Sequence, residues 1–190
     1  MKLSAKDIWP NKVYEAARAE MRSHVIALKA VRRIALAPDV TLVFENRDTL
    51  RWQIQEMLRA ERIETPAAVQ EELDVYNALM PDHESLSATL FIEVTDEARI
   101  AQVLHDLVGL EETLYLRFGS DEIRASFEAG RSDGARISAV QYVRFVFPPG
   151  PRDRFLTAHE AHLELRHPRL RSSVALGPEA LASLRGDLTA

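Results

Sequence analysis

The sequence contains no cysteine among its 190 residues. The chain can therefore form no disulfide and offers no thiolate nucleophile. It can hold neither a cysteine-ligated zinc ion nor an iron–sulfur cluster of the usual kind. Because disulfides are typical of exported proteins, their absence favours the cytoplasm as the default location.

Long apolar runs and glycines are also scarce. No window approaches the roughly 18 apolar residues of a spanning helix, and the first ten residues lack the apolar centre of an export signal. Only seven glycines are present, and the glycine-rich motifs of dinucleotide-binding, P-loop and hydrolase-elbow proteins do not occur. We therefore expect a protein that is neither exported nor membrane-spanning, and those three enzyme classes lose their main support.

Acidic residues outnumber basic ones, but unevenly. Residues 1–128 carry 15 basic and 23 acidic groups, whereas residues 129–171 carry 8 basic and 4 acidic groups. Nucleic-acid binding usually needs a basic face and a high isoelectric point, and this chain has an isoelectric point near 5.7. Nucleic-acid binding is therefore a distant prediction, and the later arginines are interpreted as a solvated surface or a local anion patch.

What is present is the composition of a folded protein, with 46% hydrophobic and 28% charged residues. A helical pattern covers about residues 12–33, and Lys29, Arg32 and Arg33 lie where the helix dipole favours cations. Its apolar face is predicted to include Ala17, Met21, His24, Leu28 and Val31. On that face His24 is either a packed core histidine or a ligand or proton carrier.

The segment from Thr41 to Met80 carries the densest group of polar side chains. A strand at 40–44 leads into a helix capped by Asn46 or Asp48, and Thr65-Pro66 opens a second helix. In the first helix Leu50, Ile54, Met57 and Leu58 form an apolar face, and the opposite side holds Trp52, Gln55, Glu56, Arg59 and Arg62.

Strand patterns dominate the middle of the chain. Residues 86–94 predict a central strand, and strands at 113–118, 122–128 and 137–147 are predicted to pair as consecutive neighbours in a meander. Gln141 interrupts the apolar face of the last strand. It is either a hydrogen-bonded core amide or one wall of a pocket.

Pro148-Pro149-Gly150-Pro151 is the one linker-like stretch. It divides a main domain at 1–147 from a subdomain at 148–190, which is expected to pack on the same sheet. We predict an α+β fold with a mixed or mainly antiparallel sheet, the N-terminal helices on one face and a small C-terminal α/β appendage.

One group of side chains could form a site. If the two helices after strand 40–44 pack as an antiparallel pair, their polar faces would line a cleft with carboxylates and guanidinium groups. The alternative is a network of surface charges on two amphipathic helices. The candidate binding residues are Glu45, Arg47, Asp48, Gln55, Glu56, Arg59, Glu71, Glu72 and His24.

No metal or cofactor is predicted. His159-Glu160-Ala161-His162 is one residue short of the H-E-x-x-H spacing, and with His167 it fits no common zinc site. We expect well under one equivalent of tightly held transition metal in the purified protein.

Several phrases of the chain resemble a known bacterial family, the domain of unknown function 3501. They are VIALKAVRRIAL, TLVFENRDTLRWQIQEMLRAERI, VQEELDVYNALMP, LSATLFIEV and RISAVQYVRF, within residues 12–147. The resemblance implies a small cytoplasmic protein without an assigned activity, whose relatives are often encoded beside rubrerythrin-like and iron–sulfur proteins. It implies no catalytic residues.

Two hypotheses follow. The first is a non-catalytic accessory or binding protein of a redox or peroxide-defence module, with a protein partner of redox type. The second is an enzyme or small-anion binder that uses the Glu/Arg/Gln cleft as acid, base and clamp. The sequence leaves the oligomeric state and the identity of any ligand open.

Overall fold

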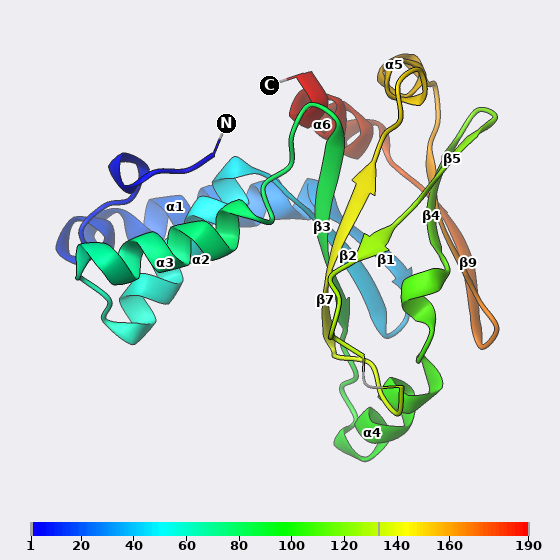
Figure 1. Ribbon diagram of the computed structural model, residues 1–190, viewed down its shortest axis with the longest axis horizontal. Helices are drawn as coiled ribbons and strands as arrows, with labels where there is room; N and C mark the ends of the chain where they lie inside the picture. Colours follow the sequence, from blue (N-terminus) through cyan, green and yellow to red (C-terminus); the bar gives the residue numbers. More distant parts are fainter. Residues whose placement is uncertain (1, 133, 190) are drawn as a thin grey trace.

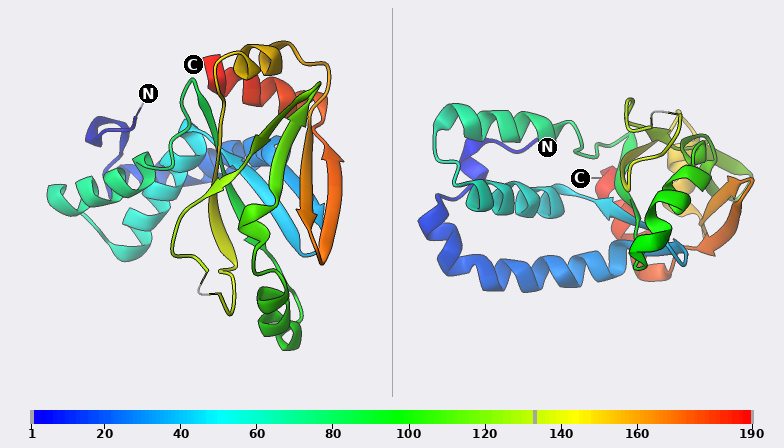
Figure 2. Two further views of the ribbon diagram at one scale, coloured as in Figure 1. Left: turned by 45° about the vertical axis from the view of Figure 1, so that its right-hand side comes forward. Right: turned by 90° about the horizontal axis from the view of Figure 1, so that it is seen from below.

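A computed structural model describes residues 2–132 and 134–189. Two antiparallel sheets lie face to face, and the N-terminal helices extend away from them as an arm (Figures 1 and 2). The predicted α+β class is therefore confirmed. The helices lie on the side of the first sheet that faces away from the second, as expected, but they project outward from this sheet (Figure 1).

The arm begins with α1 (Asn11–Arg32), close to the predicted helix. The chain then enters β1 (Arg33–Ala37), a strand that the sequence analysis missed. Ile34 and Leu36 of this strand are buried and its other side chains are less so, which is the alternation of a strand with one covered face. A turn at Pro38-Asp39 returns the chain into β2 (Val40–Glu45).

The two other helices of the arm start where the sequence predicts. Asn46 caps α2 (Arg47–Glu61) by accepting hydrogen bonds from the backbone N–H groups of Asp48 (3.1 Å) and Thr49 (3.0 Å). Thr65 caps α3 (Pro66–Asn77). These side chains satisfy N–H groups that the first helical turn leaves without partners.

The first sheet has the strand order β1-β2-β3-β7-β6. Its central strand is β3 (Ser85–Ile92), as predicted. On one side β3 pairs with β2, and on the other with β7 (Val140–Val146). The short edge strand β6 (Ser126–Phe127) completes the sheet.

The predicted meander is wrong as one sheet, although both of its predicted strand pairings occur. β4 (Leu114–Phe118) and β5 (Asp121–Arg124) do pair, but in the second sheet, whose order is β5-β4-β8-β9. At Ala125 the chain crosses between the sheets, so the predicted strand 122–128 is divided between them. Alternating apolar residues fit either sheet equally well, because periodicity records burial and not the identity of the neighbouring strand.

The segment after residue 147 supplies the rest of the second sheet and two helices. These elements are α5 (Pro151–Thr157), β8 (His162–His167), β9 (Leu170–Ala175) and α6 (Pro178–Thr189). β8 pairs with β4, and buried side chains of α6 belong to the same apolar cluster as those of both sheets. The domain boundary at residue 147 stays a prediction.

Between β3 and β4 lie α4 (Glu97–Asp106) and the short η2 (Leu110–Glu112), and η1 (Ala5–Asp7) precedes α1. Within the described part of the chain, none of the helices combines the length and the apolar character needed to cross a bilayer.

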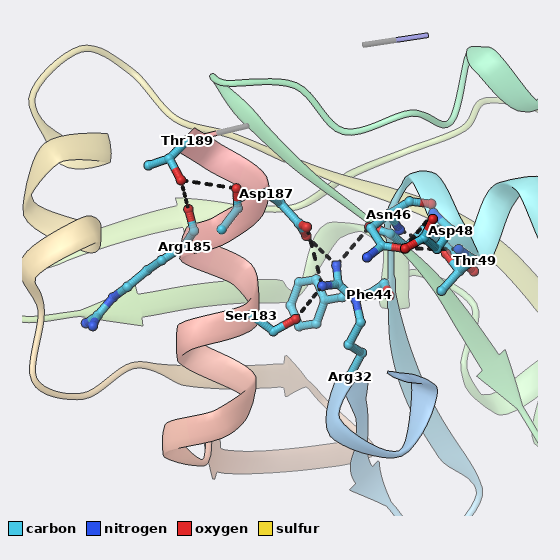
Figure 3. Close-up of polar contacts among 11 residues, drawn as sticks. Arg32, Phe44, Asn46, Asp48, Thr49, Ser183, Arg185, Asp187 and Thr189 are labelled. Carbon is cyan, nitrogen blue, oxygen red and sulfur yellow. Dashed lines mark hydrogen bonds and ion pairs between the residues drawn. The ribbon is translucent and has the colours of Figure 1, made fainter. Parts of the chain in front are cut away.

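Arg32 joins the arm to the end of β2 in the first sheet and to α6 (Figure 3). Its guanidinium group is almost fully buried and donates to the backbone carbonyls of Phe44 (2.9 Å) and Glu45 (3.0 Å) at the end of β2. It also donates to Ser183 Oγ (2.7 Å) and forms an ion pair with Asp187, both on α6. The sequence analysis placed Arg32 among cations near a helix end and did not predict that it would be buried.

Candidate binding surface on the helical arm

Glu56 on α2 is bonded on several sides. It accepts hydrogen bonds from Tyr14 Oη (2.7 Å) and from Arg18 Nε and Nη2 (both 2.8 Å) on α1, and from Arg59 Nε (3.3 Å). The bonds from Arg18 are the main cause that lowers the pKa of Glu56 to about 2. The carboxylate is thus ionised near neutral pH and ties α1 to α2. A general acid or base would need a pKa closer to the working pH.

Gln55 lies beside Glu56 in sequence but has a different role. It was predicted on the exposed side of α2, yet it is fully buried. Its Oε1 accepts a hydrogen bond from the Trp9 N–H (2.6 Å), and its Nε2 donates to the Trp9 carbonyl (3.1 Å). A buried amide that satisfies both backbone groups of another residue is costly to replace, which explains its position.

Residues 2–10, which we call the N-terminal strap, are held in the same way at a second point. Asn77 on α3 accepts from the Leu3 N–H and donates to the Leu3 carbonyl, each at 2.8 Å. Two side-chain amides, Gln55 and Asn77, therefore take the place that a neighbouring strand would have for this segment.

Two arginines of α2 complete the attachment of the strap. Arg47 forms an ion pair with Asp7, and Arg51 donates to the Asp7 carbonyl (2.7 Å) and lies 4.6 Å from the ring centre of Trp9. The pKa of Asp7 is lowered to about 2, chiefly by the Ser4 N–H and then by Arg47. Arg47 and Gln55 therefore bind the chain itself.

The remaining candidates are dispersed. Glu45 is buried at the end of β2, where it accepts hydrogen bonds from Thr49 Oγ1 (2.5 Å) and Thr89 Oγ1 (2.8 Å). Arg59 lies 3.7 Å from Glu15 in addition to its contact with Glu56. The structure thus brings Glu56 and Arg59 together, but against α1, whereas the predicted cleft lay between α2 and α3.

His24 does not lie on the apolar face of α1. Its side chain is 63% exposed, and its Nε2 lies 3.8 Å from Oδ2 of the exposed Asp48. The buried residues of α1 are Tyr14, Val25 and Arg32, whose spacings of 11 and 7 follow the helical period of about 3.6. His24 precedes Val25 by one residue, a rotation of about 100° around the helix.

Glu72 belongs to an acidic surface on α3, the turn before it and the last residue of α2. Burial raises its pKa, and the neighbouring carboxylates of Glu61 and Glu71 add to the shift. None of the acidic side chains of this surface forms an ion pair with a described residue, although ion pairs are frequent elsewhere in the protein. We call this set the acidic α3 surface: Glu61, Glu64, Glu71, Glu72 and Asp74.

A pocket of about 490 Å³ opens beside this surface. It lies between the strap, the end of α2 and the start of α3, and we call it the arm pocket. Most of its lining is apolar, with Asn11, Lys12 and Glu64 as its polar residues. The apolar lining consists of Ala5, Ile8, Trp9, Pro10, Leu58, Ile63, Pro66 and Val69.

The sequence analysis missed this pocket. Its lining comes from segments up to about 60 residues apart, which no periodicity connects. The one local signal is Ile8-Trp9-Pro10, an apolar stretch outside any predicted core face.

The described residues contain no group of three or more His, Asp or Glu side chains arranged to hold a metal ion. His167 is buried, and its Nε2 lies 3.0 Å from the Val108 carbonyl. His159 is exposed. The low metal content expected from the sequence stays a prediction.

Comparison with known proteins gives a family and a structural relative. The model of the family described as "Protein of unknown function (DUF3501)" matches residues 2–188. A crystal structure of a novel protein of unknown function from Burkholderia pseudomallei is similar, with a TM-score of 0.92 and 30% sequence identity. The match covers 99% of this chain and 100% of that chain. No curated protein matches the sequence.

Proposed function

Since the chain belongs to the DUF3501 family of proteins of unknown function, we propose its function from the structure of the arm. We propose that it is a non-catalytic binding protein that docks a basic segment of a partner protein. The partner's apolar side chain enters the arm pocket, and its lysines or arginines face the acidic α3 surface. Recognition of this kind combines an apolar anchor with a charged rim.

One observation carries the proposal. Five carboxylates lie on one short stretch of the arm, none has a cationic partner among the described residues, and the apolar pocket adjoins them. Like charges held close together cost stability, and the carboxylates of Glu61 and Glu71 add to the rise that burial causes in the pKa of Glu72. A cationic partner would remove that cost, so the surface favours a basic segment.

The Glu56 cluster supports binding more than catalysis. Its carboxylate already accepts hydrogen bonds from Tyr14, Arg18 and Arg59, and its pKa is lowered. The second hypothesis, an enzyme or small-anion binder built on Glu56 and Arg59, would require these bonds to break. It therefore has less support.

The partner's class is a further part of the proposal. The family resemblance implies a redox or peroxide-defence module, and a chain without cysteine has no thiolate with which to ligate an iron–sulfur cluster. We propose that this protein is an accessory to a redox partner, in the cytoplasm.

The direct test uses a synthetic amphipathic peptide of lysines, leucines and one phenylalanine, and a matched peptide with glutamates in place of lysines. We expect the basic peptide alone to bind, to change the fluorescence of Trp9, and to bind more weakly as salt increases. Calorimetry and tryptophan emission measure both effects. Binding of the two peptides with equal affinity would contradict the proposal.

A charge variant makes the test specific to the surface. Glu71→Gln with Glu72→Gln should weaken binding of the basic peptide at least about five-fold, because two attractive charges are lost. The same variant should not lower the melting temperature, since it removes a carboxylate whose pKa is raised by burial and by the neighbouring carboxylates. The matched control is Glu160→Gln with Glu179→Gln, two exposed carboxylates outside the arm. Equal affinities in the two double variants would refute a role for the α3 surface.

A further inference from the structure

A second cavity, of about 530 Å³, lies at the place where the chain crosses from the second sheet to the first. We call it the crossing pocket. It is bounded by η2, by the crossing segment from Arg124 to Phe127, by the loop that follows, and by Gln141 of β7. None of its lining residues belongs to the arm.

Gln141 lines this pocket and has an acceptor oxygen to which no described residue donates. The residue is 2% exposed, and its Nε2 donates to the carbonyls of Arg131 (3.2 Å) and Ser138 (3.0 Å). Its Oε1 accepts no hydrogen bond from any described residue. In the described chain, Ser172 Oγ alone is both fully enclosed and without a hydrogen-bond partner. Gln141 Oε1 also lacks a partner, so it is not fully enclosed. It therefore keeps an open side, which the pocket provides.

The charged groups of the pocket leave a second acceptor. Glu112 is paired with Arg124, and Glu128 is paired with Arg131. Arg131 also lies 4.3 Å from the ring centre of Tyr142. Both cations of the lining are thus engaged, and three glutamates face two arginines. Glu111 accepts only the Gly109 N–H (3.1 Å) among the described groups.

From these two acceptors we propose that the crossing pocket binds a small organic cation with N–H donors, such as a primary amine or a guanidinium compound. The ammonium or guanidinium group would donate to the Glu111 carboxylate, and a second donor would reach Gln141 Oε1. A charge-assisted bond to a carboxylate is stronger than a neutral one. A ligand without a donor would leave the buried amide oxygen unpaired, which gives the site its selectivity.

The test is calorimetric titration of the intact protein with four compounds of similar size. These are 1,4-diaminobutane, 4-guanidinobutylamine, butane-1,4-diol and succinate. We expect saturable binding of the two cations and none of the diol or the dianion. If neither cation binds, or if the diol binds as well as the diamine, the proposal is overturned.

Two variants assign the binding to this pocket. Glu111→Gln keeps the size of the side chain and removes its charge, and it should weaken diamine binding at least about ten-fold. Gln141→Met removes the acceptor for the second donor and should weaken diamine binding. Because Gln141 also holds the loop that precedes β7, Glu111→Gln keeps the test valid if Gln141→Met does not fold. Glu160→Gln is the matched control, and affinity of Glu111→Gln equal to this control would refute the assignment.

The outcome is independent of the function proposed for the arm. Glu71→Gln with Glu72→Gln should bind the diamine as the wild type does, and Glu111→Gln should bind the basic peptide as the wild type does. Loss of both activities in either variant would contradict two separate sites.

Discussion

Buried leucines, valines and phenylalanines fill the space between the two sheets, whereas the arm has a much smaller apolar cluster supplemented by polar bonds between its segments. In the arm, amide side chains bind the backbone of the strap, and Arg18 and Tyr14 bind Glu56. The buried residues of the arm's apolar cluster are Leu3, Leu50, Ile54, Leu58, Leu73 and Met80.

Because the sheets are stabilised mainly by apolar burial and the arm partly by polar bonds, the two regions should respond differently to substitution and to pH. Apolar burial is non-directional and is spread over many contacts, so the loss of one contact removes a small share of it. A buried hydrogen bond needs both partners, and removal of one leaves the other unsatisfied. The arm should therefore depend more on pH and on single polar side chains, and it should open locally before the sheets unfold.

The largest expected effect lies at the junction of the two regions. Arg32→Met would leave the largely buried Asp187 without its cation, and the carbonyls of Phe44 and Glu45 without their donor. Breaking one side of a buried ion pair costs about 3–5 kcal/mol of unfolding free energy. Urea denaturation measures this, and a loss below about 1 kcal/mol would show that Arg32 does not join the two regions.

A double variant separates the charge from the packing at this junction. Arg32→Met with Asp187→Leu removes both charges, and apolar replacement of a buried ion pair is often close to neutral. We expect it to recover more than half of the stability lost in Arg32→Met. If it is no more stable than the single variant, the bonds to the β2 carbonyls are the main contribution of Arg32.

A smaller effect is expected within the arm. Gln55→Met keeps the length of the side chain but leaves the Trp9 N–H and carbonyl without partners, at a cost of about 1–3 kcal/mol. Hydrogen exchange should speed up in the strap and leave the sheets protected. Gln53→Met, on the same helix and partly exposed, is the matched control. Equal exchange in both variants would mean that the amide does not hold the strap.

The smallest expected effect is the pH dependence of the arm. The folded-state pKa of Glu56 is about 2, below its ordinary value of 4.5, chiefly because of the hydrogen bonds from Arg18. Its contribution is therefore present above pH 4.5 and is lost as the pH falls toward 2. After screening of this partly exposed group, we expect about 1 kcal/mol. Asp7 titrates in the same window, so the comparison must isolate Glu56.

Glu56→Gln provides that isolation. Unfolding free energies of the wild type and Glu56→Gln, measured by urea denaturation at about pH 6 and about pH 3, should differ more at the higher pH. A difference that is the same at both values would show that the ionised carboxylate contributes no pH-dependent stability.

The candidate site was predicted in part. Sequence reasoning found the polar residues of α2 but assigned all of them to one cleft, whereas Gln55 and Arg47 bind the strap and Glu45 is buried among threonines. The sequence pattern of a helix is the same whether a polar residue faces water or a distant backbone segment. The distinction needs the position of Trp9, 46 residues earlier.

Local chemistry by itself determined where most elements begin. Asn46, Thr65 and Asp96 cap their helices, and Pro178 opens α6, because capping and the restricted backbone of proline act within three or four residues. The strands around 40–45 and 85–92 were equally clear from their apolar, β-branched composition.

Only the tertiary structure decided which strands pair and which polar groups are buried. β7 pairs with the distant β3 as well as with its neighbour β6, and Arg32 is buried against α6, about 150 residues later. Both arrangements depend on contacts between distant segments, and a periodic pattern contains no information on such contacts. The arm pocket and the crossing pocket arise at the same kind of long-range junction, so neither could be read from a single stretch of the chain.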